Sequence, residues 1–163
     1  MNVARTVRDY ARAGVAGIQL EDQVHPKKCG HMENKAIVPL AEATLRIRVA
    51  RDTTADVAIV ARTDAIATDG LDEALRRADA FLAAGADVLF IEAPTSTDEL
   101  ETIATRFVGV PLVANLVEDG KTGLVTPTHD VGGLTNALCR LRDDPDLAAT
   151  LGQNGREKFL GAL

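Results

Sequence analysis

Short apolar runs alternate with helix-like patterns along the first two thirds of the chain. Four runs have the length and apolar character of buried strands, and they cover residues 17–20, 57–61, 87–91 and 110–114. Apolar residues at helical spacing precede, separate or follow these runs, over residues 2–14, 39–52, 71–84 and 97–107. Apolar strands that are each followed by a helix are typical of a parallel sheet covered by helices. The pattern therefore predicts an α/β fold built from four parallel βα units.

Three residues give specific signals for where these helices begin and end. Asn2 stands where an N-cap is expected for the first helix, and Thr97 holds the same place in the fourth. Gly85 follows the third helix, at a position where glycine commonly ends a helix in a left-handed conformation. We predict that these three residues mark the helix boundaries.

Polar residues come directly after each of the four predicted strands. They are Glu21 with Asp22, Arg62 to Asp64, Glu92, and Asn115. The carboxyl ends of parallel strands meet at one edge of a sheet, which is where α/β enzymes place their chemistry. The loop after the first strand adds further reactive groups, namely Lys27, Lys28, Cys29, Gly30 and His31. We predict a functional site at this edge.

Composition narrows the class of protein. The 163 residues are 46% hydrophobic and 3% aromatic, and their formal net charge is −6. An acidic balance argues against a nucleic-acid or anionic-membrane surface and favours a small-molecule ligand. Cys29 and Cys139 have no paired spacing, the N-terminus lacks a signal-peptide pattern, and no run reaches the roughly 18 apolar residues of a membrane span. We expect a cytoplasmic protein.

Five motifs resemble successive motifs of the isocitrate lyase and phosphoenolpyruvate mutase superfamily. They are Ile18–Gln23, Pro26–His31, Ala61–Ala65, Phe90–Ala93 and Ala114–Asn115. The chain is most similar to the 2-methylisocitrate lyase and dimethylmalate lyase branch, over residues 2–122, and the Lys-Lys-Cys-Gly-His string is the most specific element. The resemblance implies a (β/α)8 barrel that uses Mg²⁺ to cleave a carbon–carbon bond in retro-aldol fashion.

The resemblance also implies a role for each matching residue. The implied catalytic residues are Cys29, Lys27, Lys28 and His31, the implied substrate-binding residues are Gly30, Arg62, Glu92 and Asn115, and the implied magnesium ligand is Glu21. The Cys29 thiol would protonate the carbanion-like product of cleavage, a task that suits a thiol near cationic groups. Arg62 would hold a substrate carboxylate through its planar fork. Glu21 would offer the oxygen ligand that a hard cation prefers.

Simpler interpretations of the same residues remain open. Glu21 and Asp22 are equally typical of a solvated strand end, and Arg62 and Asp64 are spaced to form a structural ion pair. A lone cysteine is more often inert than catalytic outside such a loop. His25 and His129 are interpreted as surface residues.

The chain also departs from the family pattern. A (β/α)8 barrel takes about 250 residues, whereas four strands are recognisable here, and the Asp-rich strand motif that supplies the family's principal magnesium carboxylates is not seen. We therefore expect a partial barrel over residues 1–122, in a truncated or fused copy, with a helical tail over 123–163 packed on the same domain. Residues 116–160, which overlap the end of that partial barrel, resemble the C-terminal stretch of a GT-B glycosyltransferase, with helices predicted at 134–141 and 145–160.

Three functions follow from these observations. The first is a Mg²⁺-dependent carbon–carbon lyase that acts on a small 2-hydroxy di- or tricarboxylate and gives pyruvate or a related oxoacid plus a dicarboxylate. The second is a catalytically inactive half-barrel that associates with another chain. The third is a glycosyltransferase-related fragment. We expect a small carboxylate ligand and a homo-oligomer, and no nucleic-acid or membrane partner.

Overall fold

The computed structural model describes residues 2–28, 34–113, 119–126 and 130–161. The chain forms two compact units, Met1–Ala114 and Asn115–Leu163. The first unit contains most of the predicted βα pattern, and the second contains the helical tail. The predicted boundary at residue 122 and the packing of the tail stay predictions.

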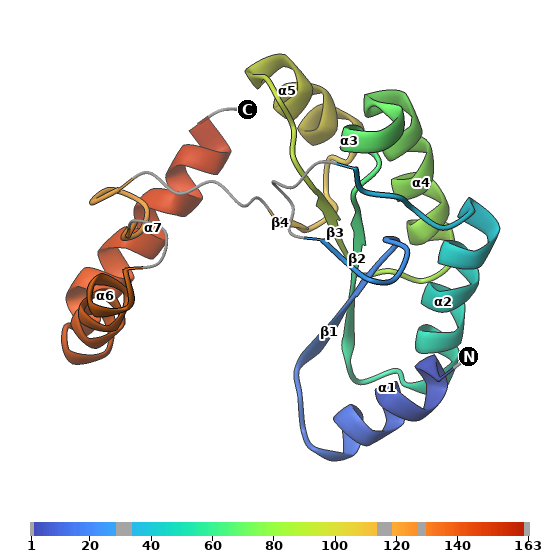
Figure 1. The fold of residues 1–163 in the computed structure, drawn as a ribbon, viewed down its shortest axis with the longest axis horizontal. Coiled ribbons are helices and arrows are strands. Elements are labelled where there is room, and N and C mark those ends of the chain that lie inside the picture. The colour runs from blue at the N-terminus through green and yellow to red at the C-terminus, as the bar shows by residue number, and fades with distance from the viewer. Residues whose placement is uncertain (1, 29–33, 114–118, 127–129, 162–163) are drawn as a thin grey trace. The chain divides into compact units, whose positions relative to one another are not determined.

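The first unit alternates helices and strands (Figure 1). Its elements are α1 (Val3–Arg12), β1 (Gly17–Glu21), α2 (Leu40–Thr53), β2 (Ala58–Thr63), α3 (Ile66–Asp69), α4 (Leu71–Ala83), β3 (Val88–Ile91), α5 (Thr97–Arg106) and β4 (Leu112–Val113). The four strands form one parallel sheet in the order β1-β2-β3-β4. The α/β class and the four βα units predicted from the apolar pattern are confirmed, and the arrangement corresponds to part of a barrel.

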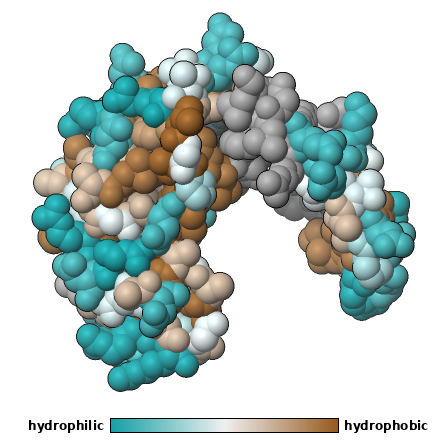
Figure 2. All heavy atoms as spheres, turned by 180° about the vertical axis from the view of Figure 1, so that it is seen from behind, coloured by the Kyte–Doolittle hydropathy of each residue, from teal (hydrophilic) through white to brown (hydrophobic). Residues whose placement is uncertain are grey.

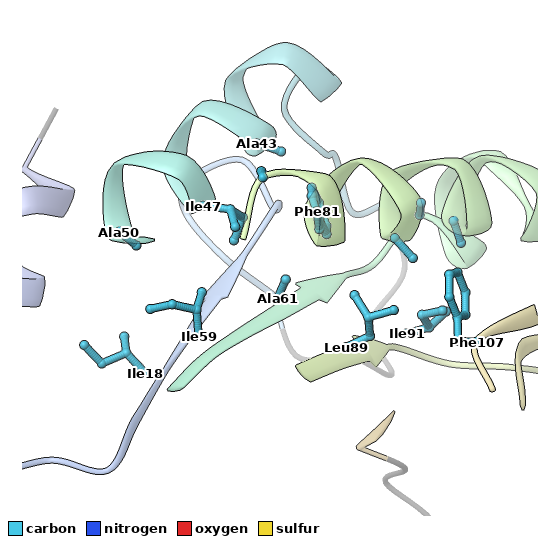
Figure 3. Close-up of a cluster of buried hydrophobic side chains, with 14 of the residues drawn as sticks. Ile18, Ala43, Ile47, Ala50, Ile59, Ala61, Phe81, Leu89, Ile91 and Phe107 are labelled. Atoms are coloured by element: carbon cyan, nitrogen blue, oxygen red, sulfur yellow. The ribbon is translucent and has the colours of Figure 1, made fainter. Parts of the chain in front are cut away.

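Helices α2 and α4 pack on one face of this sheet (Figure 1). Ile59, Ala61 and Leu89 point from the strands toward this helical layer, where they meet Ile47 and Phe81 (Figure 3). These five side chains are at most 2% exposed. Successive side chains of a strand point to opposite faces of its sheet. Arg62 directly follows Ala61 in β2, so its side chain belongs to the face opposite to α2 and α4.

Two of the three predicted helix boundaries are confirmed and one is corrected. Asn2 is the N-cap residue of α1, although its side chain makes no capping hydrogen bond. At α5 the cap is Ser96, whose side chain accepts a hydrogen bond from the backbone N–H of Glu99, so Thr97 is already the first helical residue. Gly85 does follow α4 with a φ of 101°, and an added Cβ there would meet the side chain of Arg51. Glycine is therefore required at that helix end for both conformation and space.

Two elements differ in extent from the sequence pattern. The predicted strand over 110–114 is observed only as Leu112–Val113, and its last residue, Ala114, lies outside the described part of the chain. The one-turn helix α3 was not predicted, because four residues carry too little apolar periodicity to be recognised.

The second unit contains α6 (Val131–Asp143) and α7 (Pro145–Gly161). The predicted break at Asp144 and Pro145 is confirmed, and the Asp130 side chain caps α6 through the N–H of Gly133. Leu151 is buried, whereas Leu134 and Leu138, which lie in the predicted helix over 134–141, are 51% and 59% exposed.

Surface hydropathy is uneven in the first unit. Hydrophobic surface gathers in the middle of this unit, while hydrophilic residues occupy its outer margin (Figure 2). Within the described ranges, no helix is long and apolar enough to cross a membrane.

Candidate functional site

The register of the sheet sets three site residues side by side. Glu21 of β1 pairs with Arg62 of β2, and Arg62 pairs in turn with Phe90 of β3. Residues in register on adjacent parallel strands point to the same face, here the face opposite to α2 and α4. The Arg62 guanidinium accordingly lies 4.9 Å from the centre of the Phe90 ring, a favourable cation–π arrangement.

Arg62 contacts three carboxylates at the carboxyl edge of the sheet. Its Nε and Nη2 donate hydrogen bonds of 2.9 Å and 3.1 Å to the two oxygens of Asp64. Its Nε also lies 3.6 Å from Glu21, and its Nη1 lies 3.5 Å from Glu92. The predicted convergence of these strand ends is therefore observed for Arg62, Glu21 and Glu92. The Arg62–Asp64 ion pair, which the sequence left open, is also present.

Asp64 is a fully buried carboxylate with two cationic partners. Besides Arg62, it accepts a 2.9 Å hydrogen bond from Lys35 Nζ, and the side chains of Lys35 and Asp64 are 2% and 0% exposed. Burial alone would raise the pKa of Asp64, but the hydrogen bonds from Arg62 and Lys35 outweigh it and hold the pKa below its usual value. The hydrogen bond to Asp64 likewise raises the pKa of Arg62. Asp64 is therefore ionised and fixes the orientation of the Arg62 fork.

Asp22, the neighbour of Glu21, belongs to a different network on the helix-covered face. Its carboxylate accepts hydrogen bonds from the Thr63 hydroxyl at 2.7 Å, the Asp64 backbone N–H at 3.0 Å and Arg77 of α4 at 3.1 Å. Arg77 also donates to Glu73, one helical turn away. Burial raises the pKa of Asp22, and these hydrogen bonds offset the rise only in part. This Asp22 network ties β1 and β2 to α4.

Glu92 combines burial with an incomplete set of partners. Its side chain is 4% exposed, and its Oε2 has no hydrogen-bond partner among the described residues. The next residue, Ala93, has a φ of 61°, a left-handed conformation that side-chain-bearing residues seldom adopt and that is often found at functional sites. Both features make the end of β3 a candidate position for contact with a ligand.

Gln23 and Glu21 hold the first flank of the loop after β1, by which we mean residues 24–28. The Gln23 amide, on a residue that is 3% exposed, forms two 2.9 Å hydrogen bonds with the backbone N–H and C=O of Lys28. Lys27 Nζ lies 3.1 Å from Glu21. Lys28 Nζ donates a 2.7 Å hydrogen bond to the backbone C=O of Asn34. Four of the predicted site residues, Cys29, Gly30, His31 and Asn115, lie outside the described residues.

The described residues do not by themselves fit a magnesium site. Glu21 is the predicted ligand, and its two carboxylate oxygens face Lys27 and Arg62. Across the described ranges, no group of three Asp, Glu, His or Cys side chains is arranged to hold a metal ion. Mg²⁺ prefers several oxygen ligands in near-octahedral geometry, and Glu21 offers at most part of such a set.

Three residues of the site were missed by sequence reasoning. Arg77 carried a usable signal, since it lies one turn from Ala74 and Phe81, on the buried side of a helix, where a charge needs a partner. Gln23 and Lys35 carried no local signal. Lys35 contacts a residue 29 positions away, and only the fold brings the two together.

Comparison with known proteins supplies the family. The model of the phosphoenolpyruvate phosphomutase family matches residues 1–132, about four fifths of the chain. The chain belongs to this family. The membership confirms the predicted superfamily, and the match extends ten residues beyond the predicted limit at 122. The glycosyltransferase likeness of the tail stays a prediction.

Relatives in the family include carbon–carbon lyases. The chain is 52% identical over 127 residues to the 2,3-dimethylmalate lyase of Eubacterium barkeri, covering 77% of this chain and 44% of the relative. It is 50% identical over 127 residues to the 2-methylisocitrate lyase of Escherichia coli strain K12, covering 77% of this chain and 43% of the relative. The chain thus spans about two fifths of the length of the curated relatives it matches.

Solved structures of the family share the fold. Oxaloacetate acetylhydrolase in complex with 3,3-difluorooxalacetate superimposes with a TM-score of 0.69 at 32% identity, over 98% of this chain and 65% of that one. Phosphonopyruvate hydrolase in complex with oxalate and Mg²⁺ gives a TM-score of 0.59 at 25% identity, over 98% of this chain and 64% of that one. Members of the fold family are thus known with small carboxylates and with Mg²⁺.

Proposed function

We propose that the chain carries the carboxylate-binding edge of a carbon–carbon lyase. The substrate is a small 2-hydroxy di- or tricarboxylate of the 2-methylisocitrate kind, and the products are pyruvate or a related oxoacid and a dicarboxylate. One observation carries the proposal: Arg62 meets Glu21, Asp64 and Glu92 at the carboxyl edge of a parallel sheet. The lyase activities of the relatives support it. The whole reaction is a proposal because the chain spans about two fifths of those relatives.

Arg62 has the role of holding a substrate carboxylate. Asp64 occupies the Nε and Nη2 side of its fork, and the Glu92 carboxylate lies 3.5 Å from Nη1. We propose that the substrate carboxylate displaces Glu92 from Nη1. The Glu92 oxygen that has no hydrogen-bond partner among the described residues accepts from the substrate hydroxyl group. A cation and an acceptor side by side match the carboxylate and the hydroxyl of a 2-hydroxy acid.

The proposed reaction is a retro-aldol cleavage. The 2-hydroxyl group gives its proton to Glu92, the carboxylate that accepts its hydrogen bond. The bond from C2 to C3 breaks as the carbonyl forms at C2, and the electron pair moves onto C3 of the departing carboxylate fragment. The Cys29 thiol then gives its proton to that carbon, as the family resemblance suggests. Gln23 supports this role because it holds the backbone of Lys28, the residue that directly precedes Cys29.

The decisive test is the formation of pyruvate. Purified protein is incubated with 2-methylisocitrate or 2,3-dimethylmalate and Mg²⁺, and pyruvate is followed through NADH oxidation by lactate dehydrogenase. We expect pyruvate from at least one acid, a loss of more than 100-fold in Cys29→Ser (two decades or more, as for a general acid), and unchanged turnover in the matched variant Cys139→Ser. A folded protein that forms no pyruvate and binds no oxalate in calorimetry would refute the proposal.

Among the described residues, Glu21 is the one that we propose as a magnesium ligand. Isothermal titration with MgCl₂ should show binding that weakens in Glu21→Gln and is retained in Glu42→Gln, which removes a charge from α2 away from the site. Binding that is equal in the two variants would remove Glu21 from the proposed magnesium site.

Association with another copy of the chain is the second candidate function. Among the described residues, β1 and β4 each pair on one side only, and α2 and α4 pack on the same face of the sheet. Parallel sheets are normally covered on both faces, and open edges favour pairing with another chain. Size-exclusion chromatography with light scattering tests this candidate: a homo-oligomer is expected, and a monomer at 100 µM would argue against it.

A further inference from the structure

The loop between β1 and α2 is closed by backbone hydrogen bonds at its base. The Val24 N–H donates to the Ala36 C=O at 2.8 Å, and the Val38 N–H donates to the Asp22 C=O at 2.8 Å. Gln23 and Ile37 thereby form an antiparallel bridge. The two flanks of the loop are therefore fixed against each other beside Arg62 and its carboxylate partners Glu21, Asp64 and Glu92, which we call the Arg62 cluster.

Each flank also sends a lysine to that cluster. Lys27 on the first flank reaches Glu21, and Lys35 on the second flank reaches Asp64. The two pairs differ in burial: the Lys27 side chain is 52% exposed, whereas that of Lys35 is 2% exposed. Both carboxylates also contact Arg62, at 3.6 Å and 2.9 Å.

The buried pair is poorly explained as a source of stability. Taking an ammonium and a carboxylate out of water is costly, and the attraction between them often only repays that cost. Such pairs are therefore often kept for specificity, because each charge can be satisfied in one arrangement only. Here that arrangement sets the position of the second loop flank and the direction of the Asp64 carboxylate together.

We propose that Lys35 is a positioning residue that couples the described flanks of this loop, residues 24–28 and 34–36, to the Arg62 fork through Asp64. With Lys35 in place, Asp64 Oδ1 is shared between Lys35 and Arg62 Nη2, and Oδ2 is left for Arg62 Nε. Without Lys35, Oδ1 loses one of its two donors and the carboxylate is held by Arg62 alone. The loop flank then loses its buried anchor and Arg62 loses its fixed orientation.

Hydrogen exchange and NMR test this coupling without requiring activity. In Lys35→Met, we expect backbone exchange in peptides covering 22–28 and 34–38 to rise at least tenfold, and that of α4 and β3 to stay at the wild-type rate. The Arg62 Nε–H signal of ¹⁵N-labelled protein should shift or broaden. Lys35→Arg should restore both readouts, and Arg76→Met, an exposed change of equal charge on α4, should leave both unchanged.

The alternative outcomes are distinct. Unchanged exchange in the loop flanks of Lys35→Met, or an unchanged Arg62 signal, overturns the coupling. An equal rise in exchange across α4 and β3 shows that Lys35 only stabilises the fold. If Lys35→Met does not fold, Lys35→Gln, which keeps a donor of similar length, takes its place with the same criteria.

The inference deepens the proposed function, and a third readout links the two. Oxalate affinity, measured by calorimetry, should weaken in Lys35→Met and recover in Lys35→Arg. If the wild-type protein binds no oxalate, the proposed carboxylate site fails, while the exchange and NMR results still decide whether Lys35 couples the loop to Arg62.

Discussion

Two charged networks lie back to back at the end of the sheet and differ in what surrounds them. The Asp22 network points toward α4, where Arg77 and Thr63 satisfy its carboxylate. The Arg62 cluster points to the face opposite α2 and α4 and includes Glu92, a buried carboxylate with an oxygen that has no hydrogen-bond partner among the described residues. The first network is complete within the fold, whereas the second keeps one carboxylate oxygen without a hydrogen bond among the described residues.

The separation follows from the geometry of a strand. Glu21 and Asp22 are adjacent in sequence, as are Arg62 and Thr63, yet the alternation of side chains sends the two members of each pair to opposite faces. One strand end thus supplies both a structural tie and a site residue. Charged residues that are adjacent in sequence at a strand end should therefore be assigned to the two faces of the sheet in turn, and not be treated as one site.

The largest effect is expected from breaking the Asp22 network. Asp22→Ala leaves Arg77 and the Thr63 hydroxyl without their buried acceptor, and the free energy of unfolding should fall by about 3–5 kcal/mol. Asp22→Asn keeps an acceptor and should lose less. Urea unfolding followed by circular dichroism measures both. A loss below 1 kcal/mol in Asp22→Ala would show that this network is not what ties the sheet to α4.

Arg62 should affect ligand binding more than stability. Arg62→Lys keeps the charge next to Asp64 but loses the planar fork, and oxalate affinity should fall by about 10–100-fold, the equivalent of one or two charge-assisted hydrogen bonds. Calorimetry measures the affinity, with Arg76→Lys on the exposed side of α4 as the matched control. Equal affinities in wild type and Arg62→Lys would place carboxylate binding elsewhere.

Much of this arrangement could be predicted from the sequence. The apolar runs predicted the four strands, and the strand-end rule brought Glu21, Arg62 and Glu92 to one edge. The division between the two networks was not predicted, because Glu21 and Asp22 were considered as a pair. Lys35 could not be predicted at all, since its partner Asp64 is distant in sequence and the pairing exists only after β1 and β2 align.

Lowering the pH should change the contributions of the two networks to the free energy of unfolding in opposite directions. The pKa of Asp64 in the folded protein is below its ordinary value of 3.8, so its stabilisation is complete above 3.8 and is lost as pH falls through the lowered pKa. The pKa of Asp22 is raised above 3.8, so its contribution weakens as pH rises through the raised pKa. Lys35 and Arg62 are the cations that face Asp64, and Arg77 is the cation that faces Asp22.

Unfolding free energies of wild type, Asp64→Asn and Asp22→Asn between pH 2.5 and 7 measure these contributions. The difference between wild type and Asp64→Asn should shrink below pH 3.8. The difference between wild type and Asp22→Asn should instead change above pH 3.8. Parallel pH profiles for the two variants would contradict the assigned pKa directions.

The smallest effect should come from the exposed lysine of the Arg62 cluster. Lys27→Met removes an ion pair whose lysine is half exposed, and such pairs contribute about 0–1 kcal/mol because water and salt screen them. Unfolding in 0.05 M and 0.5 M NaCl should show a small loss at low salt that disappears at high salt. Lys35→Met provides the buried counterpart, and its effect should persist at both salt concentrations because bulk ions do not reach a side chain that is 2% exposed. If the two lysine variants responded to salt alike, burial would not be what distinguishes the two flanks of the loop.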